Sequence, residues 1–308
     1  MERETGAPQL RSLRIGEIFD RATTFYVQNF TAFLLIVLTV LLPFAVVQYL
    51  LLRDQPADFT QLWQQIQHPG TATAASSPGA TAATLLLVLG SVLLAPYVNN
   101  AIAVGVGMLY RGEQPAYRPA FARVFARGWQ LLGTIALCVL LFLAVYVGIV
   151  LLFGIAGIAL AIGLGMRGAV TIVLMVLAMI GILFAIALVV LCCIFACYAT
   201  TLEGVSAGTA IAQAFSRLFN RREFPKALLM VLSYIALEVA VLLILGLIEV
   251  PVAAWTHSRL LQTLLSTAGG AVLNGYVAVL GAVYYFDVLT RVEGLDLEVE
   301  FARLPDAT

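Results

Sequence analysis

Six long stretches with almost no charged side chains constrain this sequence more than any other feature. Each has the roughly 20 apolar residues that an α-helix needs to cross about 30 Å of lipid hydrocarbon. With 62% hydrophobic and only 11% charged residues, the chain also departs from soluble proteins, in which about 25% of residues are charged. We expect an all-α, polytopic transmembrane helical bundle of about six spans. The expected spans are Phe30 to Leu52, Ala80 to Tyr110, Leu131 to Gly163, Ala169 to Thr200, Ala227 to Thr256 and Leu260 to Val288.

The Lys and Arg residues predict which ends of these spans face the cytoplasm, because positively charged loops stay on the side of synthesis. Of the 17 Lys and Arg residues, only Arg53, Arg167 and Arg259 fall on one set of connections. We expect the other set of connections and both termini to be cytoplasmic. The basic residues on that side are Arg3, Arg11, Arg14, Arg21, Arg111, Arg118, Arg123, Arg127, Arg217, Arg221, Arg222, Lys226, Arg291 and Arg303.

A short amphipathic stretch precedes the first, third and fifth expected spans. These stretches place their apolar residues at the i, i+3, i+4, i+7 spacing of one helical face. We expect interfacial helices that lie flat in the inner leaflet, with their arginines towards anionic lipid headgroups. One explanation of this pattern is a repeated unit of one interfacial helix followed by two spans. The other is that basic cytoplasmic loops commonly form amphipathic helices without any repeat. The apolar faces are Ile15, Ile18, Phe19, Ala22, Phe25 and Tyr26; Phe121, Val124, Phe125 and Gly128; and Ile211, Ala214, Phe215, Leu218 and Phe219, the last beside Arg217 and Arg221.

These features predict three parts of the chain. Residues 1–29 form a cytoplasmic arm with an interfacial helix, residues 30–290 form the six-span transmembrane domain, and residues 291–308 form an acidic cytoplasmic tail. The lipid bilayer and its anionic headgroups are the expected partners, together with a membrane or cytoplasmic protein. Nucleic acid is not an expected partner, because the net charge is +0 and nucleic-acid binding relies on a basic surface.

Polar side chains in mid-span are the first candidates for a functional site, because an ionisable group in hydrocarbon is costly. Glu238 lies about 17 Å along its helix from the cytoplasmic end, Asn100 about 15 Å and Asn274 about 21 Å. The three are therefore candidates to meet. A proton or solute site is one interpretation; a carboxyl hydrogen-bonded to amides that hold helices together is the other.

No motif for catalysis or for a cofactor is present. Phosphate loops need a Gly-rich turn and a Lys, whereas Lys226, the only lysine, follows Pro225. The two histidines, His68 and His257, lie far apart in sequence and do not predict a multi-histidine metal centre. The cysteines fall inside apolar stretches, where we expect small buried side chains. They are Cys138, Cys192, Cys193 and Cys197. We expect no cofactor, no metal and no enzymatic activity.

Two segments resemble a known group of bacterial membrane proteins. GEIFDRATTFYVQNF (Gly16 to Phe30) and YYFDVLTRVEGLDLE (Tyr284 to Glu298) are similar to proteins related to the membrane domain of glycerophosphoryl diester phosphodiesterase. The match in the second segment consists of Asp287, Arg291, Glu293, Gly294, Asp296 and Leu297. Leu289 and Val292 stand where basic residues are usual in that group. The phosphodiesterase activity of the group resides in a separate barrel domain, and nothing in this chain supplies its metal-binding residues.

The matched residues also predict a charge cluster at the cytoplasmic rim. We expect side chains of the first interfacial helix to pair with side chains that leave the last span, which would join the two ends of the bundle. Independent contacts of each set with headgroups are the alternative. The cluster comprises Arg14, Glu17, Asp20, Arg21, Asp287, Arg291, Glu293 and Asp296.

The leading functional expectation is a non-enzymatic scaffold or partner subunit of the bacterial inner membrane. The alternative is a transporter or channel for a small solute or lipid, with the polar site around Glu238 lining its path. An intramembrane enzyme would need paired carboxylates or a histidine at the interface, and the sequence offers no such pair.

Overall fold

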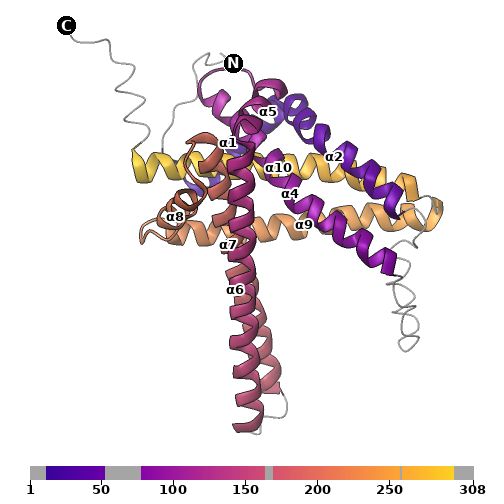
Figure 1. The fold of residues 1–308 in the computed structure, drawn as a ribbon, viewed down its shortest axis with the longest axis vertical. Coiled ribbons are helices and arrows are strands. Elements are labelled where there is room, and N and C mark those ends of the chain that lie inside the picture. Colours follow the sequence, from indigo (N-terminus) through magenta and orange to yellow (C-terminus); the bar gives the residue numbers. More distant parts are fainter. Residues whose placement is uncertain (1–11, 53–77, 164–168, 257–258, 295–308) are drawn as a thin grey trace. The chain divides into compact units, whose positions relative to one another are not determined.

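A computed structural model of the chain describes residues 12–52, 78–163, 169–256 and 259–294. These residues form α-helices joined by short connections, and no β-strand occurs among them (Figure 1). The expected all-α fold is therefore confirmed. In chain order the helices are α1 (Ile15–Gln28), α2 (Phe30–Leu52), α4 (Pro78–Tyr110), α5 (Tyr117–Ala126), α6 (Gly128–Gly163), α7 (Ala169–Leu202), α8 (Ala207–Leu218), α9 (Phe224–Thr256) and α10 (Arg259–Glu293).

Six of these helices, α2, α4, α6, α7, α9 and α10, are long and apolar enough to cross a membrane. Their ends differ from the expected spans by at most five residues. The agreement has a simple cause: a chain in hydrocarbon must satisfy its backbone groups internally, and a continuous helix does so. The largest difference is at the end of α10, which continues to Glu293 and so carries Asp287, Arg291 and Glu293 on one helix.

A short helix precedes the first, third and fifth spans, as expected, because α1, α5 and α8 come directly before α2, α6 and α9. The amphipathic face predicted for α1 is confirmed by the burial of Ile18, Ala22, Phe25 and Tyr26. In α5, Phe121 and Val124 are buried, but Phe125 is 64% exposed. The predicted apolar face of α5 is therefore narrower than the sequence pattern indicates.

The expectation that the arginines of these helices point to headgroups is wrong for Arg217 on α8. Its side chain is only 2% exposed, and it lies on the inward face of α8 with Ala210, Ala214 and Leu218. Carboxylates on neighbouring helices compensate its charge, which removes the need for solvent or headgroup contact.

The chain divides into two compact units. One contains Gly16–Ala122 and Leu237–Tyr284; the other contains Leu10–Ile15, Arg123–Ala236 and Tyr285–Thr308. The helices α9 and α10 therefore each contribute one part to each unit.

In the unit that contains α2 and α4, the Tyr26 side chain of α1 contacts α10. Its hydroxyl donates a hydrogen bond to the backbone carbonyl of Val272 at 2.6 Å, and its ring centroid lies 5.8 Å from that of Tyr276. Gly275 permits this approach, because a Cβ atom there would lie 3.1 Å from the Tyr26 hydroxyl. Burial raises the pKa of Tyr26 to about 12, so the phenol keeps the proton that it donates.

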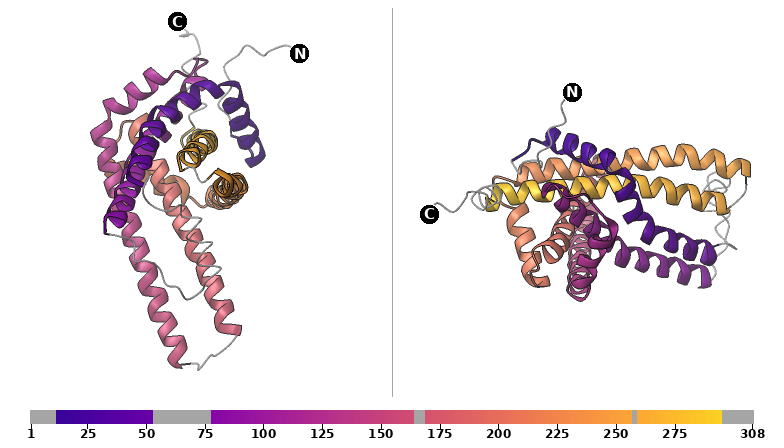
Figure 2. Two further views of the ribbon diagram at one scale, coloured as in Figure 1. Left: turned by 90° about the vertical axis from the view of Figure 1, so that its right-hand side faces the viewer. Right: turned by 90° about the horizontal axis from the view of Figure 1, so that it is seen from above.

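In the other unit, α6 and α7 run side by side as an antiparallel pair (Figures 1 and 2). The hydroxyls of Thr134 and Thr200 lie 2.8 Å apart between them. The thiols of Cys138 and Cys193 each contact the backbone carbonyl of the other residue, at 4.0 and 3.9 Å. Cys138, Cys192 and Cys197 are buried, Cys193 is half-buried, and all four are free thiols. They pack as small side chains, as expected.

Candidate functional site

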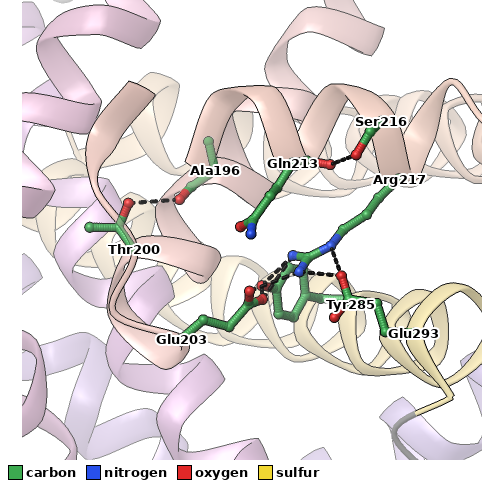
Figure 3. A network of polar contacts seen from close by, with 8 residues as sticks. All are labelled: Ala196, Thr200, Glu203, Gln213, Ser216, Arg217, Tyr285 and Glu293. Atoms are coloured by element: carbon green, nitrogen blue, oxygen red, sulfur yellow. Dashed lines mark hydrogen bonds and ion pairs between the residues drawn. The ribbon is translucent and has the colours of Figure 1, made fainter. Parts of the chain in front are cut away.

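Three polar side chains surround Arg217 of α8 in a largely buried network (Figure 3): Glu203 just after α7, and Tyr285 and Glu293 on α10. The Arg217 guanidinium donates from Nη1 and Nη2 to the two carboxylate oxygens of Glu203, both at 2.8 Å, and from Nε to Glu293 at 2.8 Å. Its Nη1 also lies 3.1 Å from the Tyr285 hydroxyl, and that hydroxyl donates to Glu203. We call Glu203, Arg217, Tyr285 and Glu293 the Arg217 network.

The electrostatics of the Arg217 network favour the charged guanidinium. Burial by itself opposes the charge, but the hydrogen bonds and negative charge of Glu203 outweigh burial with help from Tyr285 and Glu293, so the pKa of Arg217 is raised. The pair with Glu203 is two-pronged, which adds geometric specificity. The pair with Glu293 is weaker, because 44% of that side chain is exposed and solvent screens it.

A second cluster holds the backbone of Leu13 against α9 and α10. The Leu13 N–H donates to Asp287 Oδ1 at 2.5 Å. The Leu13 carbonyl accepts hydrogen bonds from Lys226 Nζ at 2.7 Å and from Arg291. Lys226 also forms an ion pair with Asp287, and Arg291 Nε lies 3.2 Å from Asp287 Oδ2. We call Leu13, Lys226, Asp287 and Arg291 the Leu13 clamp.

Glu223 lies beside the Leu13 clamp, with one carboxylate oxygen 3.9 Å from Arg291 Nη1. Its other oxygen is buried and has no hydrogen-bond partner among the described residues. The clamp side chains and Glu223 carry two cations and two carboxylates in a small volume. The Asp287 side chain is fully buried, and its charge is tolerated because both cations and a backbone N–H surround it.

Two arginines cap the C-terminal end of α7: Arg123 on α5 and Arg127 between α5 and α6. Arg127 donates to the carbonyls of Thr200 and Thr201 at 3.3 and 3.0 Å, and Arg123 donates to that of Leu202 at 3.3 Å. The last carbonyls of a helix lack partners within it and carry partial negative charge, so guanidinium groups suit them. Gly204 closes the helix with φ +79°, the left-handed conformation usual at this position.

Asp287, Arg291 and Glu293, three residues of the predicted rim cluster, belong to the Leu13 clamp and the Arg217 network. Asp287 and Arg291 pair with each other. Their other charged partners are Lys226 and Glu223, and that of Glu293 is Arg217; none of these three was assigned to that cluster. The N-terminal segment reaches them through the backbone of Leu13.

Pairing of Arg291 with Glu17 or Asp20 stays a prediction. Arg14 and Asp20 are exposed, Glu17 is half-buried, and the Arg21 guanidinium lies 6.0 Å from the Tyr110 ring centroid. Asp296 lies outside the described residues, as do His68 and His257.

The three mid-span candidates have different surroundings. Asn100 is fully buried; its amide nitrogen donates to the Pro96 carbonyl at 2.8 Å, and its Oδ1 has no hydrogen-bond partner among the described residues. Glu238 and Asn274 are exposed. No hydrogen bond joins any two of the three, all of which belong to the described part of the chain. The structure therefore does not bring them together.

Sequence reasoning missed Glu203, Glu223 and Leu13 as members of the clusters and assigned Lys226 only a place in a basic loop. The available signal was two glutamates inside the connection that also holds Arg217, Arg221, Arg222 and Lys226. Acidic residues in a basic cytoplasmic loop indicate internal pairing rather than headgroup contact. Leu13 carries no such signal, because it takes part through its backbone.

No group of three or more His, Cys, Asp or Glu side chains within the described ranges is arranged to hold a metal ion. The clusters bring charges together without an arrangement of nucleophile and base. What they do is join α7, α8, α9 and α10 with the segment that precedes α1.

The fold defines a multi-pass α-helical membrane protein. The Arg217 network and the Leu13 clamp connect its helices through buried polar contacts. No protein-family model matches the chain, and no curated protein or solved structure is significantly similar to it.

Proposed function

We propose that this protein is a non-enzymatic scaffold or partner subunit of the bacterial cytoplasmic membrane, with both termini in the cytoplasm. The observation that carries the proposal is the use of charge in the Arg217 network and the Leu13 clamp. There, the charge of Arg217 is compensated by Glu203 and Glu293. Lys226 and Asp287 pair with each other and hold the Leu13 backbone. Groups held in this way fix helices in place.

The distribution of Lys and Arg supports the orientation. Exposed aromatic side chains support an interface near the start of α6, where Phe125 and Trp129 project from the surface. Aromatic rings are enriched at the headgroup level of membranes. The resemblance of both ends of the chain to relatives of the glycerophosphoryl diester phosphodiesterase membrane domain supports a role beside a separate catalytic protein.

A second candidate, transport, is favoured by the buried Oδ1 atom of Asn100. A polar atom without a partner inside a span is expensive and is found where an ion or solute passes. Under this alternative, Glu238, Asn100 and Asn274 line a path for a small solute, a proton or a lipid.

A flux measurement separates the two candidates. Purified protein is reconstituted into liposomes that contain a pH-sensitive dye, and a potassium gradient with valinomycin drives protons across the bilayer. The scaffold predicts the same rate as protein-free liposomes for the wild type and for Glu238→Gln. A wild-type rate above that background, lowered by Glu238→Gln, would overturn the scaffold and support transport.

A further inference from the structure

The antiparallel pair of α6 and α7 is longer than the hydrocarbon core of a membrane is thick. α6 has 36 residues and α7 has 34, so at about 1.5 Å per residue each helix is roughly 50 Å long. The hydrocarbon core measures about 30 Å. If the pair stands upright, about 20 Å of each helix therefore extends beyond the core.

Both helices are apolar over their full length. Between Gly128 and Leu202 the sequence holds one charged residue, Arg167, in the connection between α6 and α7. The similarly long helices α9 and α10 each contain several charged residues, among them Glu249 and Asp287. Neither α6 nor α7 therefore has a charged segment that suits water outside the core.

The two helices keep one register along the pair. The hydroxyls of Thr134 and Thr200 lie 2.8 Å apart, and one turn further along, Cys138 contacts Cys193. Continued at this register, the pairing reaches the adjoining ends of α6 and α7. Neither helix contains proline, a common cause of kinks, whereas α2, α4 and α9 each contain one. The pair is therefore one straight unit (Figure 1).

One end of the pair is marked by charge. Arg123 and Arg127 precede α6 and bind the last carbonyls of α7, so guanidinium groups gather where α6 begins and α7 ends. Arginine side chains near helix ends extend to the membrane interface. We call this the arginine end. Depth in the bilayer can be counted from it, starting at Gly128 on α6 and at Leu202 on α7.

We propose that the α6–α7 pair crosses the membrane at an inclination of about 50°, with its whole length in lipid hydrocarbon, and that this inclination follows the thickness of the bilayer. An upright pair leaves two apolar helix ends in water, which the hydrophobic effect opposes in proportion to the exposed area. Tilting removes that exposure at a modest cost. Natural membranes differ in thickness by only a few Å, so thicker lipid alone does not cover the excess.

The surface of the pair is thus a binding surface for lipid acyl chains, and a thick bilayer fits it better than a thin one. The inference goes beyond the proposed scaffold, because it requires only that α6 and α7 cross the membrane. A second protein that covers the far end of an upright pair is the competing occupant. The two arrangements differ in rise across the bilayer, which is about 0.9 Å per residue for the inclined pair and about 1.5 Å for the upright one.

A depth measurement in liposomes of the purified protein distinguishes the two arrangements. The four native cysteines are replaced by alanine, and an environment-sensitive fluorophore is attached to Leu152→Cys or to Leu177→Cys. Each position lies roughly 37 Å along its helix from the arginine end. Phospholipids that carry a nitroxide in the headgroup or in the acyl chain quench the label on contact. Leu140→Cys is the matched control, because it lies within hydrocarbon in both arrangements.

The proposal predicts that the labels at Leu152 and Leu177 lie about 22 Å across the bilayer and are quenched by the acyl-chain nitroxide, as at Leu140. Both labels should stay in hydrocarbon when short-chain phosphatidylcholine replaces long-chain phosphatidylcholine, because the inclination increases. Quenching of either label by the headgroup nitroxide, or by cobalt ions in the water, overturns the proposal. The proton-flux measurement is independent of this outcome, so the scaffold and the inclined pair can fail separately.

A shortened pair tests whether length sets the inclination. Deletion of residues 155–161 and 171–177, which are opposite each other in the register of Thr134 and Thr200, removes about two turns from each helix. The shorter pair needs less inclination, so the label at Leu152 should move about 4 Å further across the bilayer. Replacement of the same segments by leucine at unchanged length is the control, with no shift expected.

An unchanged depth of the Leu152 label in the shortened protein would overturn the link between length and inclination. Helical content and Tm are measured for every variant, so that misfolded protein is not scored.

Discussion

The backbone N–H of Leu13 donates a hydrogen bond to the carboxylate of Asp287 at 2.5 Å, although 274 positions separate the two residues. The carbonyl of Leu13 is also held, by Lys226 and Arg291. Both backbone groups of one residue are thus satisfied by charged side chains, and the Leu13 side chain is buried. Charge-assisted hydrogen bonds are about twice as strong as neutral ones, so this contact fixes the segment before α1 to the ends of α9 and α10.

Replacement of Asp287 is expected to release that segment. Asp287→Asn removes the negative charge that compensates Lys226 and Arg291, which should cost about 3 kcal/mol of unfolding free energy. Arg14 is exposed and follows Leu13, so trypsin should cut after Arg14 faster in the variant than in the wild type. Mass spectrometry of timed digests in detergent measures the rate. Asp20→Asn, at an exposed position, is the control, and equal rates in all three proteins would contradict the prediction.

Removal of the Arg217 side chain is expected to destabilise the protein more than removal of any exposed arginine. Arg217→Met leaves the carboxylates of Glu203 and Glu293 without their counter-ion. Since these side chains are 24% and 44% exposed, solvent screens part of the loss, which should be about 2 kcal/mol. Arg222→Met, in the exposed turn before α9, should change stability by about 0.5 kcal/mol or less. Thermal unfolding followed by circular dichroism compares them. Similar Tm values for the two variants would show that the network contributes little.

Substitution of Gly204 should loosen the end of α7. The residue has φ +79°, and a Cβ atom would lie 2.4 Å from the Arg127 guanidinium. Gly204→Ala should therefore cost about 1 to 2 kcal/mol from backbone strain and displacement of Arg127. Gly208→Ala, in α8 with no atom within 4 Å of a new Cβ, should be neutral or stabilise by about 0.5 to 1 kcal/mol. The prediction fails in a denaturant titration that ranks the two variants in the opposite order.

The orientation of the spans can be tested with one accessible cysteine. In a protein whose four cysteines are replaced, Glu113→Cys lies in the exposed connection between α4 and α5. We expect it to react with a membrane-impermeant maleimide only after the cells are opened, because this connection is assigned to the cytoplasm. Labelling in intact cells, once the outer membrane has been permeabilised, would invert the assigned topology.

The spans were predictable because their signal is local. From Phe30 to Leu52 no charged residue interrupts the chain, and α2 has those bounds. At the end of α10 the absence of charge no longer predicts the helix boundary. The charged residues Asp287 and Arg291 suggest that the span ends near Val288. In the structure, Lys226 and the Leu13 backbone compensate these charges, and the helix continues to Glu293.

The clusters were less predictable because a sequence shows that a charge lies near a span but not which neighbouring helix it meets. Arg217 has the spacing of a residue at the edge of an amphipathic helix, where a headgroup contact is the usual expectation. Only the approach of α7 and α10 shows that Glu203 and Glu293 are its partners. Glu238 was recognised as unusual from the sequence, whereas its exposed position required the structure.

The passage of α9 and α10 through both compact units has a consequence for synthesis in the cell. Residues 237–284 complete one unit and residues 285–294 help to complete the other, so both require α10 to have left the ribosome. A chain interrupted within α10 would leave Leu13, Lys226 and Arg217 without the carboxylates that α10 supplies. In such a product Lys226 would lose its counter-ion Asp287, whereas Arg217 would keep Glu203. The unpaired lysine would mark the incomplete chain for quality-control proteases.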